Sequence, residues 1–97
     1  MHVISVVEGK VPSTKTKSLK TSFLSLRQRP KPPGWLRSTL LKNNKEPTIY
    51  RIETVWEDME SFENMVCNTP RPTPSELFEN VGATTTVEIF ELIETLP

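Results

Sequence analysis

The sequence predicts one α+β domain over residues 1–97, with helices on one face of an antiparallel sheet. Three observations support this fold class. Residues 48–66 change from strand-type to helix-type periodicity without a break. Two proline-rich segments, 29–34 and 69–74, exclude helix and mark connections. The expected order of strand, helix, strand, strand, helix, short helix and strand is that of the ferredoxin-like split βαβ arrangement.

Residues 2–11 are expected to form the first strand, covered on both faces, because apolar residues recur there without clean alternation. A helix is expected over residues 13–29. It would bury a narrow apolar stripe at helical spacing: Leu19, Phe23 and Leu26. The prolines of 29–34 end this helix, since proline lacks an amide hydrogen and restricts the residue before it. Residues 35–41 are expected to form the second strand.

The stretch from 48 to 66 is the most informative part of the chain. Residues 48–56 are rich in β-branched and aromatic side chains, which suit a packed strand. Asp58 is a suitable N-cap, because its carboxylate can accept amide hydrogens of a first helical turn. The apolar residues that follow lie at the spacing of one helix face: Met59, Phe62, Met65 and Val66. A strand that leads directly into a helix ending near Asn68 is therefore expected.

The connections and the last helix follow from turn and capping signals. Asparagines within 42–47 favour a hairpin loop. Residues 69–74 are expected to form a rigid, extended linker. Residues 73–76 match a capping box with proline at the first helical position, which predicts a short helix over 74–80. This helix would bury two large side chains, Leu77 and Phe78. Gly82 suits the stop after it.

The last strand, expected over residues 84–93, is apolar on both sides. Val87, Ile89 and Ile93 lie on one side, and Phe90 and Leu92 lie on the other. A chain of this length cannot cover both faces of its sheet by itself. A second subunit, packed sheet against sheet, is the simplest cover, so we predict a homodimer through the sheet face.

Charge is divided sharply between the two halves of the chain. Residues 1–45 carry a net charge of about +9 and residues 46–97 about −9, although the whole chain is neutral. The halves can neutralise each other within one fold, offer a basic surface to an anionic ligand or nucleic acid, or guide the pairing of subunits. The aromatic–basic run expected of an RNA-binding sheet is missing, so no nucleic-acid partner is predicted.

Composition also indicates a location. No run approaches the roughly 18 apolar residues of a membrane span, and the N-terminus lacks the basic start and apolar length of a signal peptide. Cys67 is the single cysteine, so it cannot form an internal disulfide and fits a reducing compartment. We therefore predict a cytoplasmic protein without a membrane partner, and we expect Cys67 to be a small buried hydrophobe.

The inventory of reactive side chains excludes several classes of enzyme. One histidine, His2, and one cysteine leave no nucleophilic triad and no zinc motif, so no metal site is predicted and no catalytic residue is identified. The candidates for an apolar substrate pocket between sheet and helices are Trp35, Tyr50, Arg51, Trp56, Phe62 and Met65. The alternative is that these aromatic residues simply form the core of a small domain.

An aromatic strand ending in Val55-Trp56-Glu57, then a helix starting Met59-Glu60-Ser61-Phe62, resembles the antibiotic biosynthesis monooxygenase (ABM) family of small dimeric α+β barrels. The segment from Leu77-Phe78 to Phe90 is also similar. The resemblance implies a cofactor-independent monooxygenase that acts on an aromatic or quinol-type small molecule. The deprotonated substrate would itself activate dioxygen, while the protein supplies an apolar cavity, a few hydrogen bonds and exclusion of water.

The resemblance also implies which residues would contact such a substrate, namely Trp56, Tyr50 and Arg51. Haem-degrading relatives use an Asn on the first strand, and a Trp and a His on or just after the second helix. Here the first strand offers Ser5 and Glu8, and Met65 stands in place of the Trp. We therefore expect no haem and no other cofactor. The competing hypothesis is a non-catalytic dimeric module that binds a small hydrophobic or aromatic ligand, or only assembles.

Overall fold

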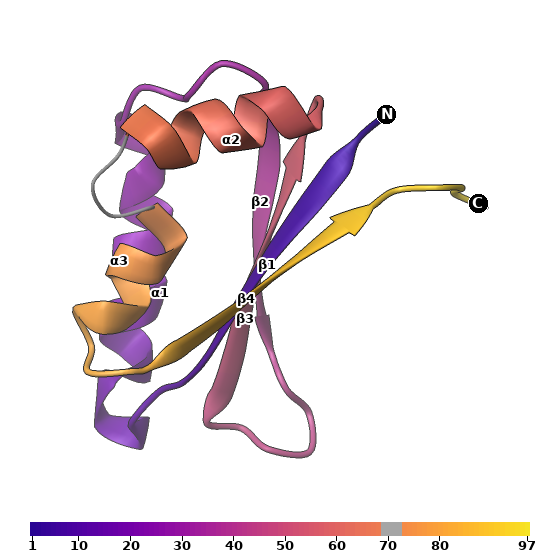
Figure 1. Cartoon of the computed structure of the whole chain (residues 1–97). Coiled ribbons are helices and arrows are strands. Elements are labelled where there is room, and N and C mark those ends of the chain that lie inside the picture. Colours follow the sequence, from indigo (N-terminus) through magenta and orange to yellow (C-terminus); the bar gives the residue numbers. More distant parts are fainter. Residues whose placement is uncertain (69–72) are drawn as a thin grey trace.

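The computed structural model describes residues 1–68 and 73–97 (Figure 1). Within them the chain forms four strands and three α-helices. Their order is β1 (Val3–Lys10), α1 (Thr16–Ser25), β2 (Trp35–Lys42), β3 (Ile49–Trp56), α2 (Met59–Asn68), α3 (Thr73–Glu79) and β4 (Thr85–Glu91). The element order matches the one expected from the sequence. Most of the linker expected over 69–74, residues 69–72, lies outside the described part.

The four strands form one antiparallel sheet in the order β2-β3-β1-β4. All three helices lie on the same side of this sheet (Figure 1). The register places Val3 opposite Trp56 and Val7 opposite Ile52, so the odd-numbered residues of β1 and the even-numbered residues of β3 share the helix-covered face. The predicted α+β, ferredoxin-like fold is confirmed.

Buried side chains on the helix-covered face gather in two groups. The first, which we call the filled cluster, lies under α1 and α3 and consists of Val7, Val11, Leu19, Ile52, Leu77, Phe78, Val81 and Ala83. The second, which we call the indole cluster, lies under α2 and consists of Val3, Trp56 and Met65, with Trp35 and Phe62 packed against them. The predicted burial of Leu77 and Phe78 is confirmed.

Phe78 explains why β1 contains a glycine. A Cβ atom at Gly9 would lie 2.9 Å from Cδ1 of Phe78, so only glycine lets the ring pack on the strand backbone. The helix that carries Phe78 ends at Gly82, which has a φ of +80°. The amide of Ala83 donates to the carbonyl of Phe78 at 3.0 Å, which closes the helix end.

The start of α2 is fixed by its cap and by a contact with the proline segment. The Asp58 carboxylate accepts hydrogen bonds from the amide of Ser61 at 2.8 Å and from the Ser61 hydroxyl at 2.6 Å. The Gly34 carbonyl accepts one from the amide of Glu57 at 2.8 Å. Gly34 has a φ of +82°, and a Cβ there would collide with the Ser61 side chain. Close packing therefore ties the segment before β2 to the first turn of α2.

Some expectations about the helices need correction. The helix expected over 13–29 is α1 flanked by two 3-10 turns, Ser13–Lys15 and Leu26–Gln28. Cys67, expected to be buried, is exposed, because α2 turns Met65 toward the sheet instead. Met59 and Val66, expected on the buried stripe of α2, are about 40% exposed. Among the described residues, no helix has the length and apolar character that crossing a membrane requires.

Candidate functional site

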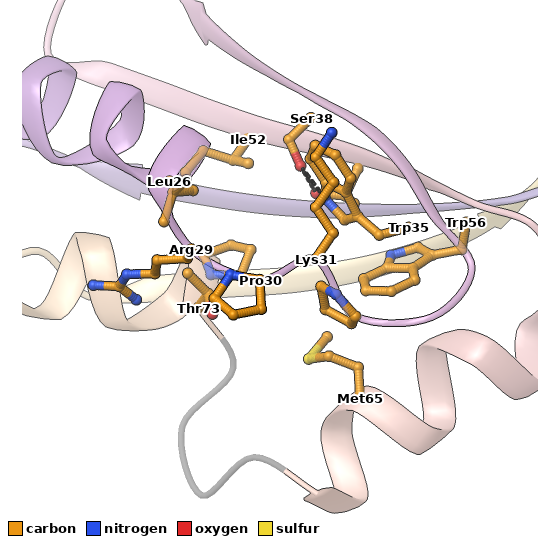
Figure 2. A pocket seen from close by; sticks show the side chains of 13 residues that line it. Leu26, Arg29, Pro30, Lys31, Trp35, Ser38, Ile52, Trp56, Met65 and Thr73 are labelled. Atoms are coloured by element: carbon orange, nitrogen blue, oxygen red, sulfur yellow. Dashed lines mark hydrogen bonds between the residues drawn. The ribbon is translucent and has the colours of Figure 1, made fainter.

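A cavity of about 220 Å³ lies between the sheet and the helices, beside the indole cluster. Figure 2 shows that its walls come from β2, β3, α2, the start of α3, and the segment between α1 and β2. Trp35, Trp56 and Met65 form the apolar wall on one side, and Leu26 and Ile52 close the other. The lining is mostly apolar with a few polar groups, which is the usual composition of a small-molecule site.

Trp56 is the most firmly held wall of the cavity. Only 2% of its surface is exposed, and its indole nitrogen donates a hydrogen bond to the Ser5 hydroxyl at 3.0 Å. Phe62 packs edge-on against the ring, with the two ring centroids 6.0 Å apart. Because the indole N–H is bonded to Ser5, Trp56 offers a ligand an apolar surface and no hydrogen-bond donor.

Trp35 belongs to a short hydrogen-bonded chain along the cavity wall. Its indole nitrogen donates to the Ser38 hydroxyl at 3.0 Å, and the Ser38 oxygen lies 2.7 Å from the Thr54 hydroxyl. Two hydroxyl groups carry two hydrogens, and their mutual bond uses one of them. Neither hydroxyl forms a further hydrogen bond with the described residues. One hydroxyl hydrogen of the Ser38–Thr54 pair therefore remains available beside the cavity.

A cation lies at the same place. The Lys31 ammonium is 4.9 Å from the centroid of the Trp35 ring, within the range of a cation–π contact. In Figure 2 the Lys31 side chain runs along Trp35 toward Ser38, whereas the Arg29 guanidinium points away from both indoles. Of the two cations among the described lining residues, Lys31 is thus the one that lies against Trp35 and extends toward Ser38.

The predicted pocket residues do not all gather at this cavity. Trp35, Trp56 and Met65 line it, and Phe62 lies behind Trp56. Tyr50 packs against the filled cluster and borders a shallow groove between α1 and β2. As substrate contacts, all six remain predictions.

Arg51 lies on the opposite, uncovered face of the sheet. There it forms ion pairs with Glu8 at 3.1 Å and Glu53 at 3.5 Å. The hydrogen bond to Glu8 is the main cause that raises the pKa of Arg51 above its usual value. Burial opposes this rise, and the charge of Glu8 and the hydrogen bond and charge of Glu53 add to it. These side chains are partly exposed to solvent, so such pairs contribute little to stability.

Several lining residues were not foreseen from the sequence. Lys31 was overlooked because the prolines around it indicate only where a helix cannot continue. Ser38 and Thr54 were overlooked because hydroxyl residues are common on strands. The sequence did contain a signal for Thr54, because this polar residue lies between the apolar residues Ile52 and Trp56 on one face of β3. Among the described residues, no group of three or more His, Cys, Asp or Glu side chains could hold a metal ion.

The fold and the cavity define a small ferredoxin-like α+β protein with an aromatic pocket between its sheet and its helices. The sequence profile described as "Antibiotic biosynthesis monooxygenase" matches residues 2–67. The chain therefore belongs to the antibiotic biosynthesis monooxygenase family. No curated protein sequence matches it.

Solved structures of the same fold cover nearly the whole chain. SnoaB from Streptomyces nogalater, a cofactor-independent oxygenase, is 23% identical with a TM-score of 0.71, over 99% of this chain and 97% of SnoaB. MhuD from Mycobacterium tuberculosis, a haem degrader solved with two haems in its active site, is 23% identical with a TM-score of 0.73, over 98% and 99% of the two chains. A conserved protein from Methanosarcina mazei Go1 is 17% identical with a TM-score of 0.71, over 93% and 91%. At these identities the likeness concerns the fold.

Proposed function

We propose that this chain is a cofactor-independent oxygenase that acts on a small phenol or quinol bound in the cavity between Trp35 and Trp56. The observation that supports this function is the combination of two indole walls with one available hydroxyl hydrogen from the Ser38–Thr54 pair. The rings would hold a planar substrate, and the hydroxyl would orient its oxygen. Family membership supports the class of reaction.

The proposed reaction balances without an added reductant. The ionised phenol donates electrons to dioxygen, and a carbon–oxygen bond forms at the ring. The O–O bond then breaks, one oxygen remains as a quinone carbonyl, and the other leaves as water with the two hydrogens that the substrate loses. The substrate is oxidised and dioxygen is reduced, so the protein has to bind, orient and exclude bulk water.

The size of the cavity limits the substrate. Ligand pockets for drug-sized molecules usually measure roughly 300–1,000 Å³, and this cavity measures about 220 Å³. One ring or two fused rings suit that space better than four. We therefore propose a substrate of naphthol size.

Oxygen consumption with a panel of phenols and quinols tests the proposal. We expect uptake with naphthol-sized compounds, and we expect it to rise with pH through the ionisation of the substrate's own hydroxyl. Treatment with a chelator should leave the rate unchanged. Turnover that depends on added metal, or purified protein with stoichiometric haem or flavin, would contradict the mechanism.

The second candidate function is a non-catalytic dimeric module that binds a small aromatic ligand. The fixed position of Trp56 supports it, because Ser5 and Phe62 hold this ring as a rigid apolar surface on which an aromatic ligand can pack. Binding of panel compounds without oxygen uptake would support this second function over the first.

We also propose that two copies pair through the uncovered face of the sheet. Ile4 is opposite both Val55 and Phe90 in the register, which places an apolar row across that face, and Phe90 is 49% exposed. The two edges of the sheet differ in charge. On the uncovered face, β2 carries Arg37, whereas β4 carries Glu88. In a two-fold dimer, opposite charges of this kind favour pairing of unlike edges.

Light scattering at micromolar concentration tests the dimer. We expect a particle of about twice the 11.1 kDa chain mass. Phe90→Glu should shift the protein to monomer, because it adds a charge to the apolar row. Val87→Glu is the matched control, since Val87 lies on the same strand but opposite Val7 on the other face. A wild-type monomer would overturn the proposal.

A further inference from the structure

We infer that the cavity is built for an aromatic anion and that Lys31 is the residue that selects the charge. The ligand class is one or two fused rings that carry an anionic oxygen group, either a carboxylate or an ionised hydroxyl. This inference rests on the proposed function in placing the ligand in the same cavity, and it narrows the substrate class.

The first supporting observation is the charge of the cavity wall. Of the described residues that line it, Arg29 and Lys31 are cationic and none is acidic. The ion pairs found among residues 1–68 and 73–97 lie elsewhere, on the uncovered face around Arg51. An aromatic cavity with cations at its wall and no carboxylate favours an anionic ligand over a neutral or cationic one.

The second observation is that Lys31 is positioned before any ligand arrives. Pro30 and Pro32 flank it, and a residue before proline is held to extended backbone angles. Its ammonium rests over the Trp35 ring, and that ring is fixed by its bond to Ser38. A lysine normally loses much side-chain freedom when it binds an anion, and this placement reduces the loss.

The third observation is that the donors near Lys31 converge. The ammonium has only hydrogens to donate, and the Ser38–Thr54 pair has one hydroxyl hydrogen available. Figure 2 shows the end of the Lys31 side chain on the Ser38 side of Trp35. A ligand oxygen at this end therefore meets donors and a positive charge together. That combination suits an anionic acceptor, and it would also favour ionisation of a bound phenol.

Isothermal titration calorimetry with two matched probes tests the inference. Naphthalene-2-carboxylate is the anionic probe, and naphthalene-2-carboxamide is a neutral probe of the same shape. We expect the wild-type protein to bind the carboxylate about fivefold more tightly, the upper end for an ion pair near solvent. Lys31→Met should abolish this preference, and Lys31→Arg should retain most of it.

Lys45→Met is the control for net charge. Lys45 is an exposed lysine in the β2–β3 loop, outside the cavity, so its loss should leave the preference unchanged. Equal affinity of the wild-type protein for both probes would overturn the inference. So would a preference that survives Lys31→Met, one that Lys45→Met reduces equally, or no binding of either probe at millimolar concentration.

A titratable probe separates the two forms of anion. Binding of 2-naphthol across pH should strengthen as its hydroxyl ionises in the wild-type protein but not in Lys31→Met. These measurements contain no turnover step. Absence of oxygen uptake would therefore refute the oxygenase but not the preference for an anionic ligand. Equal binding of the anionic and neutral probes would refute that preference but not the oxygenase.

Discussion

The two ends of the helix-covered face are held together in different ways. The filled cluster is largely aliphatic and closes around Phe78, which is fully buried against the backbone of Gly9. In the indole cluster, by contrast, hydroxyl groups fix both large rings: Ser5 holds Trp56 and Ser38 holds Trp35. The cavity lies beside the second cluster.

The difference shows how a small domain can be stable and still contain a cavity. A ring held by close packing on all sides leaves no space in front of it. A ring held at its edge by a hydrogen bond, as Trp35 is held by Ser38, keeps its position even when it is only partly covered by protein. The indole cluster therefore provides rigid walls for a ligand, while the filled cluster supplies most of the apolar burial.

The largest expected effects on stability come from truncating the largest side chain of each cluster. Phe78→Ala and Trp56→Ala should each lower the free energy of unfolding by about 3–5 kcal/mol, as other large-to-small core changes do. Urea unfolding followed by circular dichroism measures this. Leu24→Ala is the control, because Leu24 is 43% exposed and its loss should cost about 0.5 kcal/mol or less. A loss below about 1 kcal/mol for Trp56→Ala would show that the ring is not a structural wall.

The next effect concerns the proline segment that closes the cavity. Gly34→Ala should destabilise by about 2–3 kcal/mol, since it combines a strained positive φ with a collision against Ser61. Gly82→Ala is a matched control, because Gly82 has a similar φ of +80° but no atom within 4 Å of the added Cβ. It should cost only about 1 kcal/mol. Equal losses in the two variants would show that the contact with α2 is unimportant.

A smaller effect tests the hydrogen bond to Trp56 alone. Ser5→Ala leaves the buried indole N–H without a partner and should cost about 1–3 kcal/mol. The same change in a Trp56→Phe background should cost much less, because no N–H remains to be satisfied. A double-mutant cycle on unfolding free energies measures the difference. Additive losses would contradict the interpretation of this cluster.

The smallest effect concerns the cap of α2, which carries Met65. Hydrogen bonds from the Ser61 hydroxyl and amide lower the pKa of Asp58 below its usual value. A carboxylate with a lowered folded pKa stabilises the protein above its unfolded pKa, and that contribution is lost as pH falls through the folded value. The stability advantage of the wild-type protein over Asp58→Ala should therefore be constant near neutral pH and disappear in acid. An advantage that is independent of pH would contradict this.

Much of the fold could be predicted from the sequence because local signals agreed with one another. The strand-to-helix change near Asp58 and the capping box at Thr73 are determined by nearby residues, and both elements form where expected. The three-part structure around α1 was not predicted, because apolar periodicity does not distinguish an α-helix from short 3-10 turns at its ends. The burial of Cys67 was misjudged because it depends on how α2 rotates against the sheet.

The candidate site was less accessible to sequence reasoning. Tyr50 and Arg51 are adjacent, so strand geometry turns them to opposite faces, and only the three-dimensional arrangement shows which face borders the cavity. Lys31 is close to Trp35 in sequence, but the prolines between them predict no regular spacing. The course of this segment depends on a long-range contact, the hydrogen bond from the amide of Glu57 to the carbonyl of Gly34. Such contacts are set by tertiary packing and leave no local pattern.

The placement of the tryptophans has a practical consequence. The chain contains two tryptophans, Trp35 and Trp56, and both line the same cavity. Indole emission responds to the polarity and the charges around the ring. The tryptophan fluorescence of the native protein therefore arises entirely from the walls of the candidate site. Binding of a molecule in the cavity can then be followed by tryptophan emission without an added label.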